Sequence, residues 1–250
     1  MIVLAIQSLL AGRSDDAERL GVTAVDRAEA SGSADTVAFA RATLGRIALA
    51  NNHWELGELA AESLVHDDTA SDLGGHAELI EVRGRLALRR GEQTSAVGYL
   101  QAAQAVYRRR GRVWRVVDVS LELGKLGRST RNWTLARTSF ETAATLGDSR
   151  QRAHAALGLA ELAFDQGERT SVLAGQLADA TQMLVAAGDA TLADIARERR
   201  GVVLMSLDRD AEARKELELA RSGFENRGQA ESVARVQDVL AQLERRGEIT

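Results

Sequence analysis

The chain has 250 residues, of which 45% are hydrophobic and 27% are charged, and its formal net charge is −4. Such a composition supplies a sizeable core and excludes disorder driven by charge repulsion. Because the chain contains no cysteine, disulfides, thiolate metal sites and cysteine nucleophiles are excluded, which suits the reducing cytoplasm that we expect as its location.

The first predicted element, residues 1–12, is mostly apolar and is similar to the apolar region of a secretory signal. No basic residue precedes it, Gln7 and Ser8 interrupt it, and it is too short to span a bilayer as a helix. We therefore expect neither export nor a membrane segment. Only four residues precede its small residue Ala5, so the helix is shorter than its successors and predicts either a missing upstream unit or a self-association surface. The apolar residues of this surface are Ile2, Val3, Ile6, Leu9 and Leu10.

A repeat of 36 to 41 residues runs through the rest of the chain, which contains no proline and no recognisable strand. Small residues recur at Ala5, Gly45, Gly84, Gly124, Ala160, Gly201 and Ala241. Loop glycines lie thirteen residues before five of them, at Gly32, Gly111, Gly147, Gly188 and Gly228. An apolar stripe precedes each loop, as at Ala213, Leu217, Ala220 and Phe224. Steps of four, three and four residues put such side chains on one helix face, so each unit is predicted to be a helical hairpin.

Short polar turns, in which glycine or asparagine ends the first helix, separate the two helices of a hairpin. The turns lie at residues 12–14, 51–53, 91–93, 167–169 and 208–210. The predicted units cover residues 1–32, 33–75, 76–111, 112–147, 148–188 and 189–228, and a closing helix covers residues 229–246. We therefore predict one all-α repeat domain over residues 1–250.

This pattern resembles the tetratricopeptide repeat (TPR) family, in a variety longer than the usual 34 residues. The small first-helix residue matches the family, as do second-helix alanines such as Ala96 and Ala103. The large apolar residue between those alanines matches Leu100, Phe140 and Leu217. The proline that often closes a repeat in the family is absent from this chain. The resemblance implies a right-handed α-solenoid of about six hairpins, a non-catalytic scaffold whose concave groove binds a protein segment.

Two segments, residues 146–162 and 220–240, are similar to the sensor arrays of large bacterial transcription regulators. No phosphate-binding loop and no helix-turn-helix is recognisable in this chain. The similarity implies a regulatory part of such a regulator, without its ATPase or DNA-binding module.

The stretch AVYRRRGRVWRV at residues 105–116 combines arginines with two aromatic residues. Tyr107 falls at the repeat position of Phe224 and is therefore predicted to be core. The others form a predicted basic patch, with Trp114 in a loop region: Arg108, Arg109, Arg110, Arg112, Trp114 and Arg115. Residues 76–137 carry 13 basic and 5 acidic groups, whereas the flanks 1–75 and 138–250 are acidic. A solvated surface, an acidic protein partner and a nucleic acid are the alternatives, and the acidic flanks argue against nucleic acid.

Catalytic and metal-binding motifs are not recognisable. The one cluster of metal-ligand residue types, VHDD at residues 65–68, lacks the i, i+4 spacing that would converge on a metal from a helix. No serine falls in a nucleophile motif, so we expect a non-enzyme without metal or cofactor. Trp54 and Trp133, each nine residues after a small residue, are predicted to pack at hairpin turns.

The resemblance also implies which residues face the groove, because in the family the residue after the small first-helix residue points there. Three such residues are cations, Arg46, Arg85 and Lys125, and they are predicted anchors for an acidic protein or peptide. Neighbouring acids that could neutralise them are Glu78, Glu81, Asp118 and Glu122. One alternative is a small-molecule-sensing domain, with a ligand between Phe39, Leu49, Phe164 and Met205. The other is a nucleic-acid binder through the arginine cluster.

Overall fold

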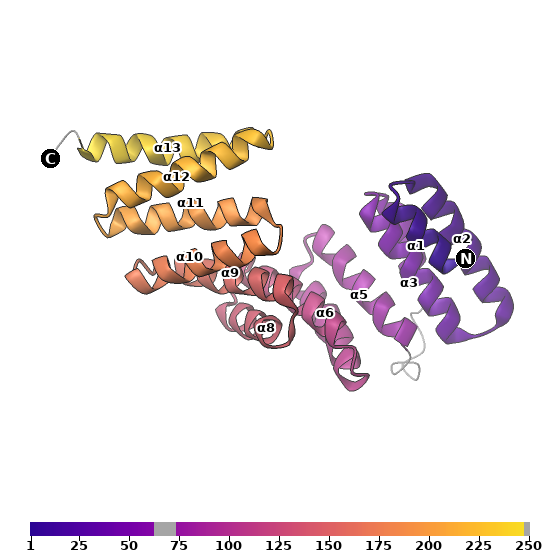
Figure 1. Ribbon diagram of the computed structural model, residues 1–250. Coiled ribbons are helices and arrows are strands. Elements are labelled where there is room, and N and C mark those ends of the chain that lie inside the picture. Colours follow the sequence, from indigo (N-terminus) through magenta and orange to yellow (C-terminus); the bar gives the residue numbers. More distant parts are fainter. Residues whose placement is uncertain (63–73, 248–250) are drawn as a thin grey trace. The chain divides into compact units, whose positions relative to one another are not determined.

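The computed structural model describes residues 1–62 and 74–247, and there the fold is all-α, as predicted (Figure 1). Within these two ranges it consists of 13 helices and no strand. The helices are α1 (Ile2–Leu10), α2 (Ser14–Ser31), α3 (Ala34–Ala50), α4 (Trp54–Glu62), α5 (Gly74–Arg89), α6 (Gln93–Arg109), α7 (Val113–Ser129), α8 (Trp133–Leu146), α9 (Ser149–Asp165), α10 (Ser171–Ala186), α11 (Ala190–Ser206), α12 (Asp210–Asn226) and α13 (Ala230–Gly247). The VHDD cluster at residues 65–68 lies outside the described residues.

Two compact units divide the chain, Met1–Val119 and Ser120–Thr250. The first holds α1 to α6 and the beginning of α7, and the second holds the rest of α7 and α8 to α13. Within the two units, consecutive helices pack together from α1 to α6 and from α8 to α13, and in Figure 1 α10 to α13 lie side by side in chain order.

The turn inside each hairpin contains one residue in the left-handed backbone region, seven positions after the small residue. Three of these residues are glycines with φ from +72° to +87°: Gly12, Gly91 and Gly167. The other three have φ from +56° to +58°: Asn52, Arg131 and Asp208. Asn and Asp tolerate this region better than other residues with a side chain, so the strain is greatest at Arg131. The period that places the small residues therefore also places the turns.

A capping box opens α9. The Asp148 carboxylate accepts a hydrogen bond of 2.8 Å from the Gln151 backbone N–H, and the Gln151 side-chain carbonyl accepts one of 3.1 Å from the Asp148 N–H. Two backbone donors that lack intrahelical partners are thus satisfied reciprocally.

Three small residues of the repeat are points of close approach between the two helices of a hairpin. A Cβ atom on Gly84, Gly124 or Gly201 would lie within 3.0 Å of Leu100, Phe140 and Leu217, respectively. The Phe140 ring also meets Gly158 of α9, since a Cβ on Gly124 or on Gly158 would lie 2.5 Å from its Cε1. The predicted match of small and large residues is therefore confirmed as direct packing.

The aromatic residues also occupy the predicted places. Tyr107 and Phe224 are fully buried. Trp54 and Trp133 are half-buried as the first residues of α4 and α8, next to the hairpin turns. The Arg89 guanidinium lies 4.1 Å above the Trp54 ring centroid, a cation–π contact.

Candidate functional site

A cavity of about 470 Å³ opens in the first unit, among helices that each come first in a hairpin. Its lining residues are Ile6 and Leu9 of α1, Phe39, Thr43, Arg46 and Ile47 of α3, Glu78 of α5, and Trp114 and Arg115 of α7. Five of them are large and apolar, and three are ionisable. Ligand sites in proteins have this size and this mixture of apolar walls with a few polar groups.

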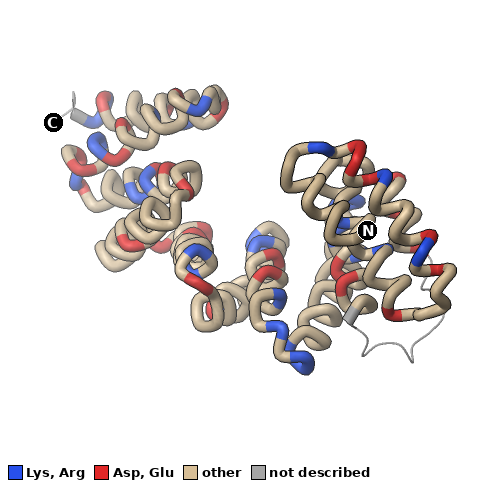
Figure 2. The backbone as a smooth tube through the Cα atoms, turned by 45° about the vertical axis from the view of Figure 1, so that its right-hand side comes forward, with Lys and Arg blue, Asp and Glu red and all other residues tan. Residues whose placement is uncertain are grey.

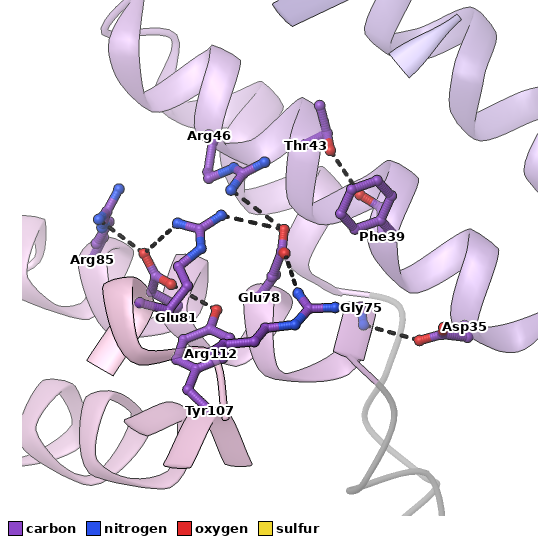
Figure 3. A network of polar contacts seen from close by, with 11 residues as sticks. Asp35, Phe39, Thr43, Arg46, Gly75, Glu78, Glu81, Arg85, Tyr107 and Arg112 are labelled. Carbon is purple, nitrogen blue, oxygen red and sulfur yellow. Dashed lines mark hydrogen bonds and ion pairs between the residues drawn. The ribbon is translucent and has the colours of Figure 1, made fainter. Parts of the chain in front are cut away.

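Glu78 is the centre of a buried ion network at the cavity (Figure 3). Its Oε1 accepts a hydrogen bond of 3.0 Å from Arg112 Nη1. Its Oε2 lies 3.3 Å from Arg46 Nη1 and 3.5 Å from Arg115 Nη2. One carboxylate with 3% of its side chain exposed is thus shared by three guanidinium groups.

Glu81 extends the network one helical turn along α5. Its Oε1 lies 2.8 Å from Arg85 Nη2 and 3.5 Å from Arg115 Nη1, and its Oε2 accepts a hydrogen bond of 2.7 Å from the Tyr107 hydroxyl. The Tyr107 ring, which completes the apolar stripe of α6, therefore carries a polar end that the buried carboxylate satisfies.

Helical spacing explains why these groups meet. Glu78 and Glu81 are three residues apart on α5, so both carboxylates project from one face. Arg112 precedes α7 directly and Arg115 lies in its first turn, so two guanidinium groups face the two carboxylates. Buried charges are retained when they are paired in this way.

Burial raises the pKa of the Glu78 carboxyl above its ordinary value, and the charges of Arg46 and Arg112 oppose that shift. Asp35, which accepts a hydrogen bond of 2.9 Å from the Gly75 N–H, adds to the increase. Burial, followed by the charge of Glu81, raises the pKa of Tyr107. The tyrosine therefore stays a hydrogen-bond donor.

The three predicted groove cations have different surroundings. Arg46 lines the cavity and pairs with Glu78, and Arg85 pairs with Glu81 without lining the cavity. The predicted neutralisation by these two acids is confirmed. Lys125 is exposed and belongs to the second unit.

The predicted basic patch is divided in the structure. Its first three arginines are exposed at the end of α6, where Figure 2 shows a run of basic residues: Arg108, Arg109 and Arg110. Arg112 and Arg115 turn instead to the buried carboxylates. The placing of Trp114 in a loop is wrong, because α7 begins at Val113, directly after the turn that contains Gly111. The ring is 57% exposed, and the Arg115 guanidinium lies 4.3 Å from its centroid.

The predicted small-molecule pocket does not coincide with the cavity. Phe39 lines it, but Leu49 is not among its lining residues, and Phe164 and Met205 belong to the second unit. Sequence reasoning missed Glu78 and Glu81 as the buried centre. A signal was present, because the place three residues before the small residue holds leucine at Leu121 and Leu157 but glutamate at Glu81 and Glu198.

The second unit repeats the motif with Asp194 and Glu198 of α11. Both carboxylates are buried. Arg227 hydrogen-bonds Asp194, and Arg235 binds Glu198 through two hydrogen bonds of 2.6 and 2.8 Å. Here Asp194 is paired by an arginine that follows α12 of the same hairpin, and Glu198 by an arginine of α13.

Among the residues that the structure describes, no three or more His, Asp or Glu side chains are grouped so that they could hold a metal ion. No helix within residues 1–62 and 74–247 has the length and apolar character to cross a membrane. On α1, Val3 and Leu10 are exposed while Ile2, Ile6 and Leu9 are partly buried, and self-association through this end stays a prediction.

No protein-family model and no curated protein sequence matches the chain. Among solved structures, the apo form of RapI, a TPR-like helical repeat protein, has a TM-score of 0.79 and 13% identity over 99% of this chain and 70% of its own. BtubC from P. vanneervenii has a TM-score of 0.40, 13% identity and coverage of 94% and 92%. A tetratricopeptide repeat protein from Parabacteroides merdae has a TM-score of 0.49, 14% identity and coverage of 94% and 97%. The likeness to RapI shows the fold alone, a TPR-like helical repeat, as the sequence resemblance predicts.

Proposed function

We propose that the chain is a non-catalytic interaction scaffold that binds a segment of a partner protein on the face formed by the first helices of its hairpins. The observation that carries the proposal is the cavity in the first unit, whose walls come from α1, α3, α5 and α7. Trp114 lines this cavity and is 57% exposed. Exposed aromatic rings are frequent anchors in protein interfaces.

The repeat architecture supports this proposal. Stacked helical hairpins offer extended surfaces. Such surfaces are better suited to binding a polypeptide segment than to forming a compact active site. The sequence similarity of residues 146–162 and 220–240 to regulator sensor arrays supports a setting in the regulatory part of a bacterial transcription regulator, in the cytoplasm.

Site-specific photo-crosslinking in the source cell tests the proposal. A benzophenone amino acid replaces Trp114 in one variant and Val172, a 64% exposed residue of α10, in a matched control. We expect a discrete crosslinked protein from position 114 and none from position 172. A second substitution, Leu9→Gln, changes the cavity wall and should abolish the crosslink, whereas Leu10→Gln on the exposed side of the same helix should leave it. The absence of any crosslink specific to position 114 would refute the proposal.

Small-molecule sensing is a second candidate, which the cavity volume of about 470 Å³ favours. Native mass spectrometry of the chain purified from its source distinguishes it from the first. A retained small ligand that is lost in Leu9→Gln but kept in Leu10→Gln supports sensing. A chain that carries no extra mass in either variant removes the support for this candidate.

Nucleic-acid binding has less support than either. Arg112 and Arg115 of the predicted cluster already pair with buried carboxylates, which reduces the basic surface that could contact phosphates.

A further inference from the structure

Arg115 of the first network makes longer contacts with its carboxylates than Arg235 makes in the second. Arg235 makes two hydrogen bonds shorter than 3 Å to Glu198. Arg115, by contrast, lies 3.5 Å from both Glu78 and Glu81, and its buried Nε has no hydrogen-bond partner. Oε2 of Glu78 likewise has ion-pair neighbours but no hydrogen bond. Buried donors are usually satisfied, so the guanidinium groups at this cavity retain bonding capacity.

The charge of the network is also unbalanced. The ionisable residues that line the cavity are Arg46, Arg115 and Glu78. Glu78 also accepts a hydrogen bond from Arg112, and Arg115 also pairs with Glu81, so the cavity wall itself carries two positive charges and one negative charge. An anionic group entering the cavity would meet the two guanidinium groups of Arg46 and Arg115, whereas a cationic group would meet a single carboxylate, Glu78, that already pairs with three arginines.

The rest of the wall is apolar. Ile6, Leu9, Phe39, Ile47 and Trp114 surround the charged groups. A large apolar side chain that contacts these residues would leave water, which favours binding in proportion to the area covered. A phosphate backbone would leave these walls uncovered, so the combination of charge and apolar surface indicates a polypeptide that carries both features.

We propose that the segment bound here presents an aspartate or glutamate side chain to Arg46 and Arg115 while a neighbouring large apolar side chain lies against Phe39, Ile47 and Trp114. This inference rests on the proposed function and specifies the chemistry of its partner. The carboxylate supplies a hydrogen-bond acceptor for Arg115, whose Nε has none, and the apolar side chain supplies the anchor.

A library of random peptides displayed on phage and selected on the whole immobilised chain tests the inference. We expect enriched peptides to contain an acidic residue next to a large apolar one. Synthetic copies, measured by fluorescence anisotropy, should lose about tenfold or more in affinity when the acidic residue is replaced by its amide, which is the effect of losing one charge-assisted hydrogen bond. This exchange requires no change in the protein.

Protein variants locate the contact. Arg46→Met should weaken the acidic peptides by a similar factor and should make them indifferent to the acid-to-amide exchange. The control Arg110→Met, at the exposed end of α6, should change affinity less than twofold. Circular dichroism checks the fold of each variant, and Arg46→Gln, which also removes the charge, replaces Arg46→Met if the latter unfolds.

The outcomes separate the two proposals. Peptides that depend on Leu9 and Trp114 but carry no acidic residue would overturn the inference and leave the proposed function standing. Peptides that bind the Leu9→Gln and Trp114→Ala variants as tightly as the parent, or a selection without binders, would overturn both.

Discussion

Alanine at Gly158 tests whether the Phe140 ring sets the distance between α8 and α9. A Cβ atom there would lie 2.5 to 2.7 Å from three ring atoms, whereas carbon atoms normally approach to about 3.5–4.0 Å. The ring is only 1% exposed, and the same ring atoms also face Gly124. It therefore has no space into which it can move.

Two effects of opposite sign decide the magnitude. Overpacking of a close-packed core costs about 1–3 kcal/mol, and alanine stabilises a helix interior by about 1 kcal/mol relative to glycine. We expect Gly158→Ala to lower the free energy of unfolding by up to about 2 kcal/mol. The matched control is Gly175 of α10, where a Cβ would meet no atom within 4 Å. Gly175→Ala should raise the free energy of unfolding by about 1 kcal/mol.

Urea unfolding followed by far-ultraviolet circular dichroism measures both changes. Both glycines lie in the second unit, so the two variants report on the same part of the chain. In thermal unfolding, each kcal/mol corresponds to a shift of about 2–4 °C in Tm for a protein of this size. If Gly158→Ala stabilises the protein as much as Gly175→Ala does, the ring moves freely and the packing argument is wrong.

Three further perturbations test the polar contacts. Glu198→Gln should lower the free energy of unfolding by about 1–3 kcal/mol, because the buried partner of Arg235 loses its charge. The loss is limited because Arg235 keeps access to water, and an unchanged urea midpoint would contradict the prediction. NMR titration should show the pKa of His53 above its ordinary value, because its ring lies 2.9 Å from the Glu18 carboxylate, and Glu18→Gln should return it to that value. This contact stabilises the fold below the ordinary pKa of histidine, and its contribution disappears as the pH rises through the raised pKa. Asp148→Ala should cost about 1 kcal/mol through loss of the capping box at α9, with Asp148→Asn retaining most of the stability in the same denaturation assay.

The hairpins were predictable because two kinds of residue must meet in each. A small residue such as Gly84 and a large one such as Leu100 recur at a constant separation, and their contact is local to one hairpin. The same holds for the left-handed turn residue, which follows the small residue after seven positions even where it is Arg131 rather than glycine. Local pairing of this kind leaves a periodic signal that one sequence is enough to show.

The candidate site was only partly predictable because its contacts join different repeats. The sequence singles out Arg46 and Trp114, and both line the cavity. Charge counting treats every arginine as solvated, since charged residues are mostly exposed. Whether Arg115 lies in water or against Glu78 depends on how α7 meets α5, and that packing carries no periodic signature in the sequence.

Burial divides the arginines of residues 108–115 into two groups that respond differently to ionic strength. Dissolved ions screen exposed charges over about 8 Å under physiological conditions, so the attraction exerted by Arg108 on a distant partner fades as salt is added. Arg115 has 7% of its side chain exposed, and mobile ions cannot surround it. Its ion pairs with the α5 carboxylates therefore persist in concentrated salt. The contact that they make between α5 and α7 does not depend on the ionic composition of the solution.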